Sequence, residues 1–180
     1  LRPSSPYAAS KAGADLWAGA YGRTYRLPVT ISRSSNNYGP RQLPEKLIPR
    51  VITRAAIGRP IPLYGQGDNV RDWLYVDDHS SGVDLILHHG KDGEVYNLGS
   101  GFGRPNRQVV ETILSILGKP HNLIEYVEDR PGHDRRYALD TNKIRRELGW
   151  RPEVSFAKGI KKTLEWYLAN RSWWQSGDEG

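Results

Sequence analysis

The sequence predicts an α/β fold, because stretches with helical periodicity alternate with short β-branched segments along most of the chain. Turn signals separate the two kinds of segment, such as SSNNYGP at 34–40 and GQGDN at 65–69. The 180 residues include six Trp and ten Tyr, which supply large apolar groups for a core. A packed body is therefore expected rather than a disordered chain.

The first expected helix covers residues 4–26. Ser4 or Ser5 can cap its start, Pro6 suits a first helical turn, and alanines give the segment high helix propensity. Pro28 cannot continue a helix and is expected to end this one.

The remaining elements follow from the same periodicities. Strands are expected at 29–33, 60–64, 72–76, 94–98 and 123–127. Helices are expected at 46–57, from Asp77 or Asp78 to 87, at 109–117 after a cap at Asn106, from Asp140 or Thr141 to 148, and at 156–168. The segment 34–40 is expected to be a turn after the first strand, where α/β folds place their ligands.

The charge balance disfavours several classes of partner. The chain has 26 Lys and Arg against 20 Asp and Glu, a net charge of +6, but its cations are scattered among acids. This pattern argues against nucleic acid, and the positive excess suits a phosphorylated small molecule. No apolar run approaches the ~20 residues that span a bilayer, so no membrane partner is expected. Zero Cys excludes disulfides and cysteine-bound zinc and fits a cytoplasmic location.

Tyr7 and Lys11 form the first candidate for chemistry. Their spacing of four residues places both side chains on one helix face, about one turn apart. A neighbouring ammonium favours the phenolate form of a tyrosine, so the pair can act as a base near neutral pH. A tyrosine and a lysine that share a helix by coincidence are the alternative.

Several longer motifs occur with this pair, in the order SPYAASKAGAD, VTISRSSNNYGP, PEKLIP, RDWLYVDDH and DRPGHDRRYALD. Together they resemble the extended short-chain dehydrogenase/reductase family over nearly the whole chain. The resemblance implies the distal part of a Rossmann-type parallel sheet plus a smaller α/β substrate-binding domain. Residues 1–40 would belong to the NAD-binding domain and 41–180 mostly to the nucleotide-sugar-binding domain, with 72–99 returning to the Rossmann sheet.

The resemblance also assigns roles around the cofactor. Tyr7 would be the active-site base, and Lys11 its electrostatic partner, which also holds the nicotinamide ribose of NAD. Asn37 would approach the nicotinamide end of NAD, and Asn36 the hexose of the substrate. Turn formation alone is the alternative for the two asparagines.

A larger set matches the family's substrate-binding positions: Lys46, Leu47, Pro62, Tyr64, Arg71, Asn106, Arg130 and His133, with Tyr137 expected to join them. Arg71 and Arg130 are the candidates for a diphosphate, because a guanidinium offers paired donors to phosphate oxygens. Tyr64 could bracket a thymine base. The alternatives are a surface salt bridge to Asp72 for Arg71, ordinary core for Tyr64 and a solvated helix start for Lys46.

Other patterns are expected to be structural. The glycine-rich stretch 99–103 does not complete GxGxxG and is interpreted as a turn. The adjacent His88 and His89 lack partners at ligand spacing, so no metal site is expected. Asp77 and Asp78 resemble a paired-carboxylate site, but their place at a helix start favours capping.

Within the family, the motifs are most similar to those of members that dehydrate dTDP-glucose. That resemblance implies a lyase with NAD as a recycled cofactor, in which C4 is oxidised transiently, water leaves across C5 and C6, and hydride returns to C6. The alternatives are a UDP-glucuronate decarboxylase, a 4-epimerase, or an inactive sugar-nucleotide-binding fragment. A homodimer is expected, since the helix that carries the tyrosine commonly builds a four-helix bundle in this superfamily.

The start of the sequence carries a further expectation. It contains no Met and begins at Leu1, which predicts that it starts inside a longer protein. The family's glycine-rich loop and its Asp-Glu pair both precede the tyrosine motif, and no such segment precedes Tyr7 here. These 180 residues alone are therefore expected to lack catalysis.

Overall fold

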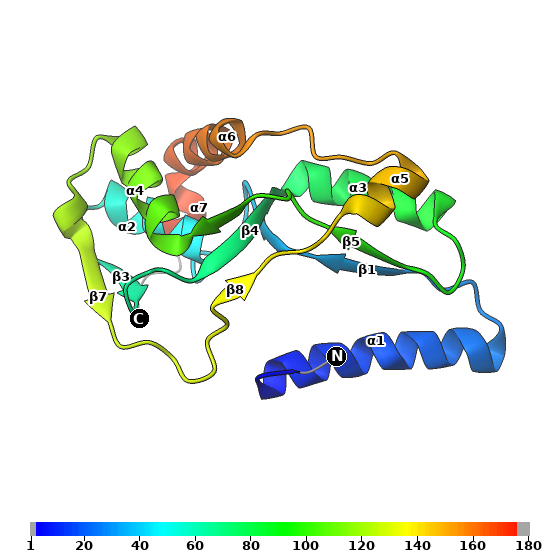
Figure 1. Ribbon diagram of the computed structural model, residues 1–180. Helices are drawn as coiled ribbons and strands as arrows, with labels where there is room; N and C mark the ends of the chain where they lie inside the picture. The colour runs from blue at the N-terminus through cyan, green and yellow to red at the C-terminus, as the bar shows by residue number, and fades with distance from the viewer. Residues whose placement is uncertain (1–2, 176–180) are drawn as a thin grey trace.

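The computed structural model describes residues 3–175 and has an α/β architecture, as predicted (Figure 1). Its helices are α1 Pro6–Tyr25, α2 Leu47–Ala56, α3 Val76–His89, α4 Asn106–Leu117, α5 Asn142–Leu148, α6 Phe156–Ala169, α7 Arg171–Gln175 and the short 3₁₀ turn η1 His121–Leu123. Its strands are β1 Ile31–Ser34, β2 Asn36–Tyr38, β3 Ile61–Tyr64, β4 Val70–Tyr75, β5 Val95–Leu98, β6 Gly103–Pro105, β7 Ile124–Val127 and β8 Arg136–Tyr137. None of the described helices has the length and apolar character needed to cross a bilayer.

The strands form small, mainly parallel groups. β1 pairs with β5, β2 with β4 and β3 with β7, all in parallel. β4 also pairs with β6 in antiparallel and with β8 in parallel, so it is the central strand of its sheet. Parallel pairs need long crossovers, which accounts for the helices that follow most strands.

Two buried clusters stabilise the structure. The larger joins α2, α4 and α6 to β3 and β4, with Ile52, Ile113 and Tyr167 fully buried. The smaller lies among α3, α5 and β5 and contains Tyr96 and Trp150. Figure 1 shows α3 and α5 along the same side of the β1–β5 pair.

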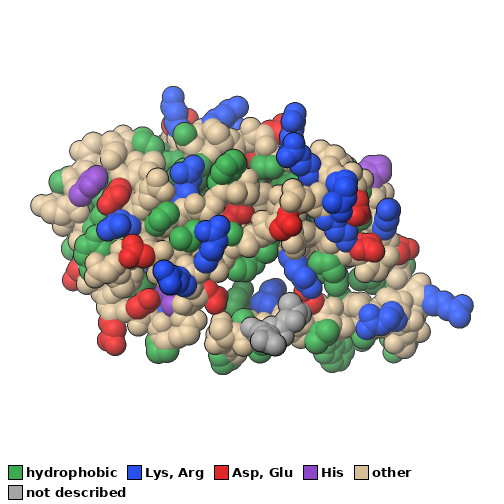
Figure 2. Space-filling model, viewed as in Figure 1, with side chains coloured by type: hydrophobic (Ala, Val, Ile, Leu, Met, Phe, Trp, Pro, Cys, Tyr) green, Lys and Arg blue, Asp and Glu red, His purple; other side chains and the backbone are tan. Residues whose placement is uncertain are grey.

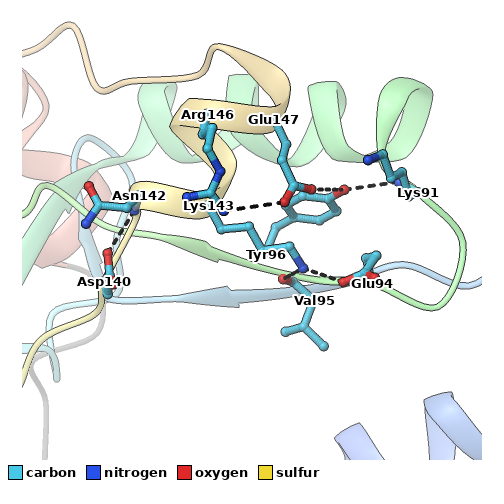
Figure 3. Close-up of polar contacts among 9 residues, drawn as sticks. All are labelled: Lys91, Glu94, Val95, Tyr96, Asp140, Asn142, Lys143, Arg146 and Glu147. Atoms are coloured by element: carbon cyan, nitrogen blue, oxygen red, sulfur yellow. Dashed lines mark hydrogen bonds and ion pairs between the residues drawn. The ribbon is translucent and has the colours of Figure 1, made fainter.

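A polar cluster fixes α5 to β5 (Figure 3). The Lys143 ammonium forms an ion pair with Glu94, donates to the Val95 carbonyl at 2.9 Å and lies 4.7 Å from the Tyr96 ring centroid. The buried Tyr96 hydroxyl lies 3.4 Å from Glu147 on α5. The Lys143 hydrogen bond lowers the pKa of the Glu94 carboxyl. This helix is therefore held by both apolar and ionic contacts.

α1 differs from the other long helices because none of its residues is buried. The predicted Ser5 cap is confirmed: its hydroxyl accepts from the Ala8 amide at 3.1 Å. The helix ends at Arg26, which has a φ of 54°, and Pro28 lies beyond that end. An ion pair from Arg33 to Asp15 connects α1 to β1.

The predicted turn at 34–40 is wrong in part, because Asn36–Tyr38 forms β2. Its pairing with β4, with Asn36 opposite Trp73, overrides the turn preference of the asparagines. β4 starts two residues earlier than the strand predicted at 72–76, and Val76 begins α3.

Two predicted caps are also wrong. α3 has Tyr75 at its N-cap, and the buried Asp78 carboxylate instead accepts the amides of Glu153 and Val154, each at 3.0 Å. Asn106 is the first residue of α4 and makes no capping bond. The prediction that Asp140 or Thr141 opens α5 is confirmed: Thr141 is the N-cap residue, and the Asp140 carboxylate accepts from the Asn142 amide at 2.9 Å. The carboxylate of Asp78 satisfies a distant backbone segment, which local sequence does not reveal.

Candidate functional site

A polar cleft of about 510 Å³ lies where α1, β1, β4 and β8 meet. The predicted site residues Tyr7, Asn36, Arg71, Arg130 and Tyr137 all line it. They come from segments far apart in sequence, and β1 contributes its carboxyl end, the expected place for a ligand in an α/β fold. In Figure 2 the surface is hollowed in this region, between β8 and the start of α1.

Two tyrosines, Tyr7 and Tyr137, line this cleft. Tyr7 is 74% exposed, whereas the Tyr137 hydroxyl donates to the Ser34 carbonyl at 3.1 Å. Burial raises the pKa of the Tyr137 phenol, and the nearby Tyr7 phenol raises it further. Lys11 is exposed one turn along α1 and does not line the cleft. Tyr7 is thus the more exposed of the two tyrosines, at 74% against 39%.

Arg71 places a positive charge in a buried position. The residue is only 8% exposed, and its guanidinium donates to the Val70 carbonyl at 2.8 Å. Among residues 3–175 no carboxylate lies within ion-pair distance of it. Burial lowers the pKa of this guanidinium; among the nearby charges, Asp134 raises it more strongly than Arg130 lowers it, and Asp129 also raises it. The cleft thus holds two guanidinium groups together with the Asp134 carboxylate, and the buried Arg71 has no direct ion pair among the described residues.

A salt bridge from Arg71 to Asp72, the alternative considered from sequence, is wrong. Asp72 is fully buried on the opposite face of β4, where it accepts from the Ser100 and Gly101 amides at 2.9 and 3.3 Å. The glycine-rich segment 99–103 therefore wraps a carboxylate of the protein itself, which agrees with its interpretation as a structural turn.

Several buried polar oxygens have no hydrogen-bond partner in the described part of the chain, among them Ser35 Oγ, Asn36 Oδ1, Asn37 Oδ1 and Asn106 Oδ1. Buried polar atoms are nearly always paired in folded proteins. Ser35 and Asn36 line the cleft, so a bound ligand can supply their partners. The side chain of Asn37 does not line it, and its carbonyl accepts from the Gln42 amide at 2.9 Å.

Tyr64 and His133 form a second group, beside the loop that carries Arg130. Their rings lie edge to face with centroids 6.4 Å apart. His133 Nδ1 lies 2.7 Å from Asp129 Oδ1, and this hydrogen bond lowers the pKa of the Asp129 carboxyl. Tyr64 is 43% exposed, which argues against the ordinary-core interpretation.

Other predicted residues lie outside the cleft lining. Lys46 is exposed at the N-cap of α2 and pairs with Glu45 at 3.5 Å, as expected for a solvated helix start. Leu47 packs against the larger core, and Pro62 is half-buried in β3. Asn106 lies at the start of α4, and only its unpaired oxygen points to a ligand role.

The sequence analysis did not select Ser5, Ser34, Ser35 or Asp134, which also line the cleft. The two serines at 34–35 could have been chosen because they follow a strand directly. Asp134 accepts a hydrogen bond from Ser4 Oγ at 2.9 Å, a contact between residues 130 positions apart that no local signal indicates. Within the described residues, no group of three His, Asp or Glu could hold a metal.

Comparisons with known proteins place this architecture in a family. Residues 1–163 match the sequence profile described as GDP-mannose 4,6 dehydratase. A dTDP-glucose 4,6-dehydratase of an Actinoplanes species is 54% identical over 97% of the chain and 54% of its own length. The enzyme of the same name from Salmonella typhimurium is 52% identical over 95% of the chain and 49% of its own length. The chain thus spans about half the length of these curated relatives.

Solved structures of related enzymes have the same fold as this chain. DesIV, a dTDP-glucose 4,6-dehydratase from Streptomyces venezuelae with NAD and TYD bound, superposes with a TM-score of 0.95 at 53% identity, covering 98% of this chain and 55% of that one. A UDP-glucose 4-epimerase from Thermotoga maritima with UDP-glucose has a TM-score of 0.89 at 33% identity, covering 94% and 55%. The resemblance found from the motifs and the predicted fold class are confirmed. With the profile match over residues 1–163, the chain belongs to the GDP-mannose 4,6-dehydratase family.

Proposed function

We propose that this chain is the nucleotide-sugar-binding part of an NAD-dependent dTDP-glucose 4,6-dehydratase. The observation that carries the proposal is the cleft, which combines an exposed tyrosine, Tyr7, with the buried Arg71, whose guanidinium has no ion pair among the described residues. The dehydratases named above are more similar in sequence than the epimerase, at 54% against 33% identity. Dehydration is therefore preferred over epimerisation or decarboxylation.

In this proposal the two arginines hold the diphosphate. Arg71 offers its charge from the floor of the cleft, and Arg130 offers a second one from the exposed loop between β7 and β8. A diphosphate would neutralise both and remove the energetic cost of an unpaired buried cation. Tyr64, stacked edge-on against His133, would bracket the thymine, while Lys46, Leu47, Pro62 and Asn106 would complete the nucleotide site through movements on binding.

The sugar would then lie toward Tyr7 and Asn36. Tyr7 would take the proton of the C4 hydroxyl, with Lys11 stabilising the phenolate from one turn away. The unpaired Asn36 oxygen would accept from a hexose hydroxyl, and Tyr137 would close this end of the cleft. Oxidation at C4 acidifies the C5 proton, so water can leave across C5 and C6.

The chain's own residues fit an NAD cofactor. The unpaired Asn37 oxygen suits the carboxamide of a nicotinamide, and the exposed Lys11 suits ribose hydroxyls. When bound, NAD supplies the acceptor for the C4 hydride and returns that hydride to C6. Residues 1–40, with 72–99, would belong to its domain, and the other residues mostly to the substrate domain.

The assembly would be a homodimer located in the cytoplasm. α1 exposes an apolar surface that includes Leu16, Trp17 and Tyr25, and all three side chains are more than half exposed. A second copy of α1 could cover this apolar surface with its own, because a twofold-symmetric interface brings the same patch of both subunits together.

The test is turnover by the full-length protein. Purified protein is incubated separately with dTDP-glucose and UDP-glucose, and products are followed by mass spectrometry. A product lighter by one water molecule, formed from dTDP-glucose only, is the expected result. An isomer of unchanged mass formed from UDP-glucose would replace the proposal with the epimerase, and Tyr7→Phe serves as the inactive control.

A further inference from the structure

His79 makes a contact beneath the cleft that the proposed mechanism does not use. It is half-buried on α3, and its Nε2 lies 2.8 Å from Ser34 Oγ at the end of β1. Helix α3 and strand β1 pack against each other, so this contact joins α3 to a residue that lines the cleft.

Ser34 connects this histidine to the tyrosines. It lines the cleft, and its carbonyl accepts the hydrogen bond of the Tyr137 hydroxyl at 3.1 Å. Tyr137 in turn lies close enough to Tyr7 for the two phenols to interact electrostatically. A continuous line of contacts therefore runs from His79 through Ser34 to the pair of phenols.

His79 is suited to keep a constant hydrogen bond to the Ser34 hydroxyl. Burial lowers the pKa of its imidazole, so the ring is neutral at physiological pH and has one donor and one acceptor nitrogen. A hydroxyl can complement either nitrogen, because it both donates and accepts. Other histidines of α3 are placed differently: His88 is exposed and bonds within its own helix, to the Asp84 carbonyl at 2.9 Å.

We propose that His79 is a positioning residue, which fixes the Ser34 hydroxyl and, through the same residue's carbonyl, the place of Tyr137 beside the reacting sugar. The inference rests on the proposed function. Since the diphosphate site is built on Arg71 and Arg130, His79 should affect the sugar end and leave the nucleotide end unchanged.

The kinetic test uses the complete NAD-loaded protein with His79→Phe, His79→Gln and Ser34→Ala, and His88→Phe as the matched control on the same helix. Loss of one neutral hydrogen bond predicts that His79→Phe lowers kcat for dTDP-glucose about fivefold to tenfold. Affinity for dTDP, which has no sugar, should stay within about twofold of the parent. Gln, whose side-chain amide can approach the place of Nε2, should restore most of the loss.

A double-mutant cycle separates positioning from mere stability. If His79 acts through Ser34, His79→Phe has no further effect in the Ser34→Ala background. Equal losses of kcat in both backgrounds, or loss of dTDP affinity in step with kcat, would overturn the proposal.

A readout without substrate keeps this test separate from that of the proposed function. In protein labelled at Tyr and His, the NMR signal of the Tyr137 ring should move in His79→Phe and return in His79→Gln, while His88→Phe leaves it unchanged. A parent protein that shows these shifts but does not turn over dTDP-glucose would reject the function and keep the positioning role. An unmoved Tyr137 signal in His79→Phe would reject the positioning role.

Discussion

Replacing Arg71 by Ala should weaken binding of dTDP far more than it changes the stability of the fold. Arg71 is 8% exposed, and no carboxylate lies within ion-pair distance of its guanidinium among residues 3–175, so a bound diphosphate can form direct hydrogen bonds to it. Hydrogen bonds to charged groups are worth about 1.5–3 kcal/mol, which corresponds to a roughly 10- to 150-fold increase in Kd. Arg71→Lys should recover only part of this, because an ammonium lacks the paired donors of a guanidinium.

The same burial predicts an unusual stability result. A buried cation without a partner costs free energy, so Arg71→Met, which keeps the volume and removes the charge, should leave Tm unchanged or raise it. Arg145→Ala, at an exposed position on α5, is the control for loss of an arginine elsewhere.

Isothermal titration with dTDP at two salt concentrations, together with thermal unfolding, measures both effects. The salt dependence of binding should become smaller in Arg71→Ala, because one phosphate contact has been removed. If dTDP bound Arg71→Ala and Arg71→Met as tightly as the parent, Arg71 would not hold the diphosphate and the reasoning from its unpaired charge would be refuted.

Further predictions concern Tyr7, Asp78 on α3, and Asp129 in the loop between β7 and β8. Tyr7→Phe in the complete enzyme should lower kcat about 10² to 10⁴-fold with little change in dTDP affinity, as steady-state kinetics and titration can show; normal turnover would remove Tyr7 as the base. Asp78→Ala leaves the amides of Glu153 and Val154 unpaired, so urea unfolding should show a loss of about 2–4 kcal/mol, unlike exposed Asp77→Ala. The lowered pKa of Asp129 means that its bond to His133 is intact above the ordinary carboxyl pKa and is lost as pH falls through the depressed one. NMR of the Asp129 carboxyl carbon should show this group titrating below the ordinary aspartate pKa, and titration at or above that ordinary value would contradict the assignment.

Local patterns predicted most of the regular structure. The helix expected at 46–57 is observed as Leu47–Ala56, and the strand expected at 60–64 as Ile61–Tyr64. Both are short segments whose capping and turn residues lie next to them in sequence, so local signals suffice. The strand at Asn36–Tyr38 was missed because its stability comes from pairing with β4, more than 30 residues away.

The candidate site likewise contains residues that local sequence could predict and residues that it could not. Tyr7, Asn36 and Arg71 were selected from motifs, and the fold does bring them into one cleft. Asp134 and the His79–Ser34 contact could not be predicted, because they depend on how distant elements pack. The catalytic and binding roles of all these residues stay predictions until the variants above are measured.

Successive side chains of β4 point to opposite faces of its sheet, and this has a consequence for the register in which the strand can pair. Arg71 faces the cleft, and its neighbour Asp72 faces the opposite side, where the turn at 99–101 surrounds it. A slip of the strand by one residue would exchange the two faces, placing a carboxylate among the arginines and a guanidinium against backbone amides that can only donate. Both errors would be electrostatically unfavourable at once. The adjacent Arg71-Asp72 pair therefore disfavours any other register of β4, so the residue proposed to bind the diphosphate also helps to align the strand.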